Sequence, residues 1–219
     1  CWFNLRSKKN SNINSNFEES EYLNKWKELL NNDILKVDLN EIIKQAKEKF
    51  NLKNAKIVAN LPYYITTPII MKLLESKIDI TSITVMIQKE VADRLAEIPG
   101  GKNTGAITYT VYYYGEPEKL LEVPKSSFIP EPSVTSEVIK INIRKEPPVK
   151  VQNEERFFKL IKVAFLQRRK TLLNSLTNNG ISNKEELTQL LSKLNIDEKI
   201  RSEKLTIDQF AELSNNLNT

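Results

Sequence analysis

The chain has 219 residues, of which 40% are hydrophobic and 28% charged, and these values are ordinary for a globular protein with a buried core. It has no histidine and one cysteine, Cys1, which excludes zinc–histidine sites, Ser-His-Asp triads, disulfides and cysteine-rich metal sites. The net charge of +5 favours a polyanionic partner, although a solvated basic surface would have the same composition.

No stretch of the sequence approaches the roughly 20 apolar residues of a membrane-spanning helix, and none has the pattern of a signal peptide. We therefore expect a soluble, cytoplasmic protein with no membrane partner and no metal. The sequence opens on Cys1 rather than Met, and residues 7–16 are polar and show little periodicity. We interpret the chain as a fragment in which residues 1–30 form an atypical N-terminal segment.

Helices and strands are expected to alternate along the first two-thirds of the sequence. The expected helices are residues 40–50, 66–76 and 89–101. The expected strands are residues 55–60, 81–88, 105–115 and 136–144. Asn40 and Thr67 are the expected N-caps of the first two helices, and the strand over 55–60 reads as buried on both faces. This alternation is typical of an α/β domain with a mainly parallel sheet, which the last two strands would close as a hairpin.

A long connection separates the last two expected strands and contains VPKSSFIPEPSV (residues 123–134). Because loops of this length inside a compact domain are usually functional, we expect a role for it in a binding site.

The remainder of the chain reads as helical. Residues 144–151 are interpreted as a linker, since no strand pattern follows them. One long helix, or two joined, is expected over residues 153–180, and two capping boxes, at residues 182–185 and 206–209, predict two further helices. The expected domains are residues 31–145, an α/β domain, and residues 146–219, a small all-helical domain.

The stretch NLPYYITTPII (residues 60–70) places an amide, a proline and two tyrosines after an apolar strand. The Asn60 side chain offers an acceptor and two donors, and Pro62 cannot donate, which leaves the preceding carbonyls as acceptors. Tyr63 adds a flat ring on which a base can stack. Ligands of open α/β sheets bind at the carboxyl ends of the strands, where Asn60 would lie. These groups suit the binding of an exocyclic amino group, but a buried asparagine in a strand-to-helix turn would give the same pattern.

NLPY (residues 60–63) is similar to the Asn/Asp-Pro-Pro-aromatic motif of amino-group methyltransferases, and the longer stretch resembles, more specifically, the ribosomal RNA adenine N6-dimethyltransferase family. Other motifs of that family resemble residues 87–108, residues 127–138 (SFIPEPSVTSEV) and residues 164–176 (AFLQRRKTLLNSL). The last of these is similar to the bacterial branch that acts on small-subunit rRNA, and the resemblance covers about residues 30–214. It implies a Rossmann-like methyltransferase domain, here N-terminally incomplete, followed by a small all-helical domain.

The resemblance also implies roles for individual residues. Asn60 and the carbonyl of Leu61 or Pro62 would accept hydrogen bonds from the adenine N6. Tyr63 would stack on a flipped-out adenine, and Phe128 would cover its other face.

The implied cofactor is S-adenosylmethionine. Asp33, with Ile34 beside it, matches the acidic residue that contacts the adenine ring of the cofactor in this family, and Asn60 completes the implied set. Without the resemblance, Asp33 would be interpreted as a turn aspartate.

A run of three basic residues, Arg168, Arg169 and Lys170, is interpreted as a contact with the phosphates of rRNA, which fits the net charge of +5. Three consecutive charges on a helix cannot share one face, so solvation and salt bridges explain the same run equally well.

Two parts of the family's cofactor site have no counterpart in the sequence, namely the Gly-rich loop and the acidic residue after the second strand. All five glycines lie downstream of Asn60. Glu18, Glu19 and Glu21 lie in SNFEESEY, which does not resemble the end of a strand. We therefore predict that this chain binds S-adenosylmethionine weakly or not at all in calorimetry. Stoichiometric binding at micromolar affinity would contradict this prediction.

Three hypotheses for the function follow. The first is a monomeric rRNA (adenine-N6,N6)-dimethyltransferase that transfers methyl groups from S-adenosylmethionine to adjacent adenines of small-subunit (16S-type) rRNA in the pre-30S particle. The second is a non-catalytic, RNA-binding ribosome-assembly factor of the same fold. The third, a resistance-type methylase acting on large-subunit rRNA, is disfavoured by residues 164–176 and the helices expected after them.

Overall fold

The computed structural model describes residues 33–217, which form two compact units. The first unit contains residues 33–92 and Pro117–Ile143, and the second contains Asp93–Glu116 and residues 144–217. The units therefore interleave along the chain. The division into domains at residue 145 stays a prediction, and the unit that holds the C-terminal helices also takes in Asp93–Glu116.

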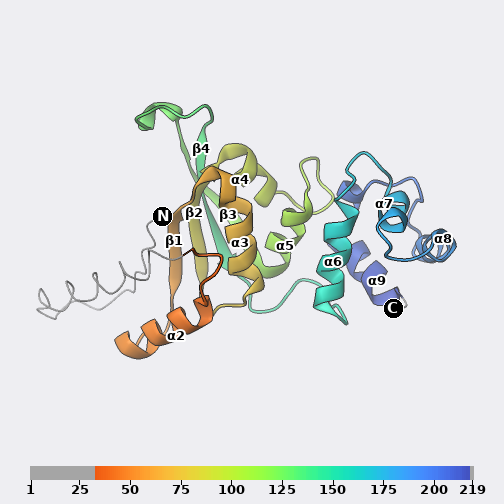
Figure 1. Cartoon of the computed structure of the whole chain (residues 1–219), viewed down its shortest axis with the longest axis horizontal. Helices are drawn as coiled ribbons and strands as arrows, with labels where there is room; N and C mark the ends of the chain where they lie inside the picture. The colour runs from red at the N-terminus through yellow and green to blue at the C-terminus, as the bar shows by residue number, and fades with distance from the viewer. Residues whose placement is uncertain (1–32, 218–219) are drawn as a thin grey trace, which may run out of the picture. The chain divides into compact units, whose positions relative to one another are not determined.

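A four-stranded mixed sheet organises the first unit, with the strand order β1-β2-β4-β3 (Figure 1). Strand β1 (Lys56–Asn60) runs parallel to β2 (Ser82–Gln88), and β4 (Ser136–Ile143) pairs with β2 in the antiparallel direction. The remaining strand, β3 (Gly115–Val123), lies beside β4 at one edge. The mainly parallel sheet expected from the sequence is therefore mixed, although its first two strands are parallel as predicted.

The core of this sheet comes from alternate residues of the two central strands. Ile83 and Ile87 of β2 and Ile139 and Ile141 of β4 are completely buried, as expected for β-branched residues that pack on a pleated surface. Strand β1 differs, because its residues alternate between exposed and buried and Val58 is 45% exposed. The expectation that β1 is buried on both faces is therefore wrong.

Helices α2 (Leu39–Phe50) and α3 (Thr66–Glu75) belong to the first unit, and α4 (Lys89–Leu95) begins in the first unit and ends in the second. In Figure 1, α3, which connects β1 to the parallel strand β2, lies in front of the sheet. The Asp38 carboxylate caps α2, accepting from the N–H groups of the second and third helical residues, so the predicted cap at Asn40 is two residues too late.

The predicted strand over residues 105–115 is a helix, α5 (Ala106–Tyr114). Its β-branched and aromatic residues are buried on nearly every side, so no amphipathic period marks it as a helix. Strand β3 instead occupies Gly115–Val123, most of whose residues are exposed. It therefore forms the hairpin with β4, and residues 124–135 are the loop between them.

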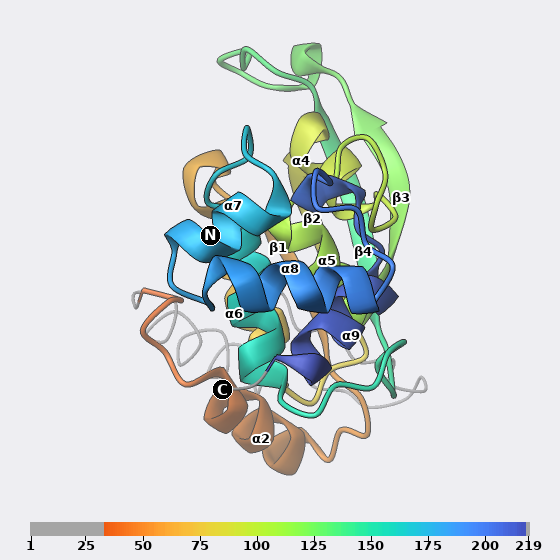
Figure 2. The same ribbon diagram turned by 90° about the vertical axis from the view of Figure 1, so that its right-hand side faces the viewer.

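Helices are the only regular elements of residues 144–217, as predicted for this part of the chain (Figure 2). They include α6 (Glu154–Ala164), α7 (Leu172–Asn178), α8 (Lys184–Lys193) and α9 (Ile207–Asn216), and the second unit also contains α5. Residues 153–180 therefore form two helices joined by a turn.

The capping box at Thr206 and Gln209 is confirmed. The box expected at Ser182 is wrong, because Asn183 is the N-cap of α8 and its side chain accepts from the Glu186 N–H.

Tyr109 joins α5 to the C-terminal part of the second unit. Its side chain is completely buried, and its hydroxyl donates to the carbonyls of Leu205 (2.6 Å) and Ser202 (3.2 Å). The ring meets Phe210 edge-on at a centroid distance of 4.9 Å. A polar tip with two acceptors inside an aromatic cluster fixes the position of α5 relative to the segment before α9.

The buried hydroxyl makes the stability of this unit sensitive to high pH. Burial, followed by the negative charge of Glu203, raises the pKa of Tyr109 above its ordinary value. Because this pKa is higher in the folded than in the unfolded chain, the contribution of Tyr109 to the free energy of unfolding is complete below the unfolded-state pKa of about 10. Above that pH the contribution falls, since only the unfolded chain then releases the proton.

We expect Tyr109→Phe to cost about 1–3 kcal/mol at pH 8, since the Leu205 carbonyl loses the hydroxyl that donates to it, and to weaken the fall in stability between pH 9 and about 11. Urea unfolding of both proteins across this range measures the difference. Parallel losses of stability with pH in the two proteins would contradict the role of Tyr109.

Candidate functional site

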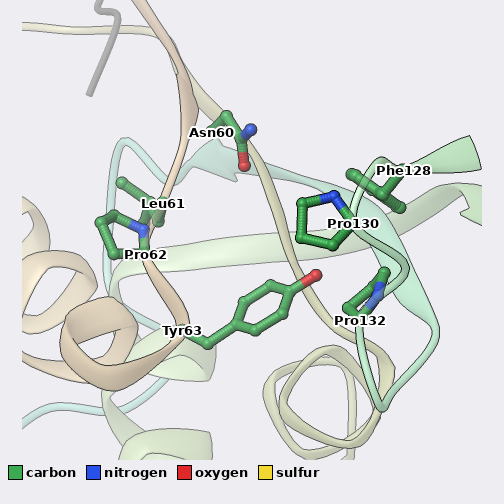
Figure 3. A pocket seen from close by; sticks show the side chains of 7 residues that line it. All are labelled: Asn60, Leu61, Pro62, Tyr63, Phe128, Pro130 and Pro132. Carbon is green, nitrogen blue, oxygen red and sulfur yellow. The ribbon is translucent and has the colours of Figure 1, made fainter. Parts of the chain in front are cut away.

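Asn60 is the last residue of β1, and from it the chain leaves the sheet (Figure 3). The Asn60 backbone lies opposite Met86 of β2, and the next N–H, that of Leu61, donates to the Met86 carbonyl at 3.4 Å. Leu61 is buried, whereas Asn60 is exposed. The strand end thus anchors the backbone through Leu61 and leaves the Asn60 amide available at the carboxyl edge of the parallel pair.

The next residues turn at once into a short 3-10 helix, Tyr63–Ile65, which leads into α3. Pro62 precedes it in an extended conformation, with φ −60° and ψ 134°. The Pro62 carbonyl accepts from the Ile65 N–H at 3.2 Å and from the Thr66 hydroxyl at 3.0 Å. The expected cap at Thr67 is therefore wrong: Ile65 occupies the N-cap position without a side-chain hydrogen bond, and Thr66 bonds back to Pro62 instead.

The loop between β3 and β4 supplies the opposite wall of a pocket of about 420 Å³. The residues that line it are Asn60, Leu61, Pro62, Tyr63, Phe128, Pro130 and Pro132. In Figure 3 the Tyr63 ring extends toward the part of the loop that carries the two prolines, and the Asn60 amide oxygen points toward the same space. All five residues assigned to catalysis from the sequence thus lie around one cavity within the first unit.

This lining suits a flat, mostly apolar ligand with a polar edge. Rings and prolines form most of the wall, and among the described residues that line it the Tyr63 phenol is the only ionisable group. The Asn60 amide can both accept and donate hydrogen bonds. A planar ring carrying an amino group could therefore lie against Tyr63 with its amino group near Asn60.

Asp33 and Ile34 lie at the beginning of the described chain. One carboxylate oxygen of Asp33 accepts from the Leu35 N–H at 3.0 Å, and the other lies 3.9 Å from the Lys36 ammonium. Lys72 of α3 donates to the carbonyls of Leu35 (2.7 Å) and Val37, which holds this turn against the helix. Asp33 is exposed, Ile34 is half-buried, and neither lines the pocket.

Arg168, Arg169 and Lys170 lie in the turn between α6 and α7, where all three are exposed. The expectation that they lie on a helix is wrong, so the restriction that consecutive helical residues point in different directions does not apply to them. They belong to the second unit.

The hydrogen bond between Ser136 and Tyr63 was not predicted from the sequence. The Ser136 hydroxyl is hydrogen-bonded to the Tyr63 hydroxyl with an O–O distance of 2.6 Å. The only sequence signal was the place of Ser136 at the end of the SFIPEPSVTSEV stretch, which also contains the lining prolines Pro130 and Pro132.

Within residues 33–217, no helix is long and apolar enough to cross a membrane. The same part of the chain contains no group of three or more His, Cys, Asp or Glu residues placed to hold a metal ion.

Comparison with known proteins identifies one family. The sequence profile described as "Ribosomal RNA adenine dimethylase" matches residues 12–219. Proteins named "Ribosomal RNA small subunit methyltransferase A" are 52% identical over 192 residues in Clostridioides difficile and 51% identical over 191 residues in Alkaliphilus oremlandii. These alignments cover 88% and 87% of this chain but 65% and 66% of the relatives, so the chain spans just under two-thirds of their length.

Two solved structures share the fold. A dimethyladenosine transferase from Plasmodium falciparum is 27% identical, with a TM-score of 0.59 over 72% of this chain and 64% of that one. The 23S rRNA methyltransferase ErmE is 19% identical, with a TM-score of 0.55 over 84% of this chain and 80% of that one. The α/β unit therefore has the Rossmann-like methyltransferase fold.

Proposed function

Because the chain belongs to the ribosomal RNA adenine dimethylase family, we propose that it transfers methyl groups from S-adenosylmethionine to the N6 amino group of adenines in rRNA. One observation carries the proposal: Asn60, Leu61, Pro62 and Tyr63 share a pocket with Phe128, which is 65 residues further along the chain than Tyr63. The mostly apolar lining of this pocket, with the Asn60 amide among its residues, supports adenine as the ligand.

The Asn60 amide oxygen is the first acceptor for the adenine amino group. The second is the Leu61 carbonyl, since the Pro62 carbonyl already accepts two hydrogen bonds and has no lone pair left for a ligand. Two acceptors on the N6 hydrogens draw the amino group out of conjugation with the ring. Its lone pair then becomes available as a nucleophile, so the chemistry needs no histidine.

Tyr63 and Phe128 provide the aromatic surfaces for the base. An adenine inside a folded RNA must first leave its stack, which costs a few kcal/mol, and stacking on an aromatic side chain recovers about 1–3 kcal/mol per base. The Phe128 backbone is held by the short helix Lys125–Ser127, to which its N–H donates at 3.1 Å.

S-adenosylmethionine supplies the methyl group when it is bound. Of the described residues, Asp33, Ile34 and Asn60 would hold it: the Asp33 side chain is exposed, its carboxylate could accept from an amino group as well as contact Lys36, and Ile34 would offer an apolar surface beside it. The carboxylate that would bind ribose hydroxyls is not among the residues that line the pocket.

The proposed target is small-subunit rRNA, because the relatives at about 50% identity are named for that subunit. We further propose that the enzyme meets this rRNA in the pre-30S particle. Arg168, Arg169 and Lys170 support this proposal, since three adjacent exposed cations in one turn can contact successive phosphates. The protein would act as a cytoplasmic monomer.

Labelled methyl transfer to undermethylated small subunits, and in parallel to large subunits, tests the function, with this chain compared with a version extended at its N-terminus. Label in adenine at N6 is the expected product of the extended version. Particle binding without any methyl transfer by either protein would support the non-catalytic assembly factor. Label that appears only in large subunits would instead support the third hypothesis.

A further inference from the structure

We propose that Ser136 is a positioning residue that sets the orientation of the Tyr63 ring in the pocket. The hydroxyls of the two residues are hydrogen-bonded at 2.6 Å, although they are 73 residues apart in the sequence. The inference deepens the proposed function, on which it rests, by naming the group that holds the stacking surface in place.

The Tyr63 ring would have considerable freedom without this bond. It lies on a three-residue 3-10 helix and is only half-buried, and its neighbour Tyr64 is 89% exposed. The first side-chain torsion of tyrosine has several staggered rotamers, so packing on one side alone does not define where the ring lies. A hydrogen bond at the tip of the ring selects one of these rotamers, because the others would carry the Tyr63 hydroxyl away from Ser136. The second torsion turns the ring about the axis through that oxygen and is left to packing.

Ser136, in contrast, is held in place by the sheet. It is completely buried and is the first residue of β4, paired with Gln88 of β2. Immediately before it, the Thr135 carbonyl accepts from the Lys89 N–H at 3.0 Å, which secures the beginning of the strand. The hydroxyl of Ser136 is thus a rigid reference point provided by the sheet.

The position of Ser136 in the chain gives this bond a second consequence. Ser136 follows directly on the loop that carries Phe128, Pro130 and Pro132, whereas Tyr63 follows β1. One hydrogen bond therefore ties the two walls of the pocket together. A base that enters between them meets a ring whose position is already set, so less freedom has to be lost on binding.

A double-mutant cycle with Ser136→Ala and Tyr63→Phe tests the coupling, because Tyr63→Phe keeps the ring and removes only the hydroxyl. The probe is an RNA hairpin that keeps the target adenine and carries 2-aminopurine beside it, since the fluorescence of 2-aminopurine rises when the neighbouring adenine leaves the stack. The measurement uses the whole chain without cofactor. Ser133→Ala, an exposed serine of the same loop, is the matched control.

We expect each single variant to lower the affinity for the flipped base by about 2- to 10-fold, and the double variant to show no further loss. Ser133→Ala should equal the wild type. The inference would be overturned if the fold-losses of affinity of the two single variants multiplied in the double variant, or if the single variants bound the RNA like the wild type. A lowered melting temperature with unchanged fluorescence would show that Ser136 serves stability alone, and would overturn it as well.

A second measurement separates this inference from the proposed function. NMR of tyrosine 13C-labelled at Cβ reports rotamer averaging about the first torsion of Tyr63 in the free chain, without any RNA. Rotamer averaging that appears in Ser136→Ala but not in Ser133→Ala supports the positioning role, and an unchanged Tyr63 signal contradicts it. A wild-type chain that never alters 2-aminopurine fluorescence contradicts the proposed function, while the NMR result still decides whether Ser136 holds the ring.

Discussion

Asn60→Ala is expected to lower methyl transfer by roughly 100-fold in the N-terminally extended version, because the variant loses one of the two acceptors that activate the adenine amino group. The magnitude follows from other enzymes in which a single preorganised hydrogen-bonding group was removed from the reacting centre. Single-turnover transfer of labelled methyl groups to undermethylated small subunits measures the chemical step directly. The effect should lie in the rate of that step, since the interaction is strongest when the amino group attacks.

Two controls make this result specific. Asn60→Asp keeps acceptor oxygens at the same position and should retain more activity than Asn60→Ala. Asn60 is exposed at the end of β1, so neither variant should change the melting temperature appreciably. Full activity in Asn60→Ala would show that the assignment of this amide as an acceptor is wrong.

Phe157→Ala is expected to destabilise the second unit by about 3–5 kcal/mol, because it leaves a large cavity in the centre of an aromatic cluster. Phe157 is completely buried in α6. Its ring lies 5.1 Å from that of Phe158 and 5.5 Å from that of Tyr113 in α5, so the substitution removes contacts both within α6 and between two helices.

Hydrogen exchange of peptides from residues 154–178 measures this loss in the second unit by itself. Leu166→Ala is the matched control, since Leu166 lies in the turn after α6 and is 65% exposed, and it should change stability by less than about 0.5 kcal/mol. Equal protection factors in Phe157→Ala and Leu166→Ala would contradict the importance of the aromatic cluster.

The parts of the fold that the sequence predicts are those whose apolar pattern has a clear period or whose ends carry a capping residue. The strand β2 and the capping box at Thr206 are examples. Helix α5 was missed because it is buried on nearly all sides and is built from Ile, Thr, Val and Tyr, which favour strands on propensity alone. Strand β3 was missed for the opposite reason: it is an exposed edge strand with charges and Pro117.

The candidate site divides in the same way. Asn60 to Tyr63 are adjacent in the sequence, so their chemistry could be interpreted together, and Phe128 was placed with them by family resemblance alone. The bond between Tyr63 and Ser136 joins the end of one strand to the beginning of another. Such a contact depends on sheet order and register, which local patterns do not contain.

The interleaved course of the chain limits how parts of it can be exchanged with a relative by recombination. Asp93–Glu116 lies between two segments of the first unit but belongs to the second. A single crossover after residue 145 would combine α5 from one parent with α6–α9 from the other. Tyr109 and Tyr113 of α5 would then pack in a core whose other side chains come from a different protein. A gene that inherits the helical unit whole must therefore inherit α5 with it, and this requires additional junctions inside the methyltransferase unit.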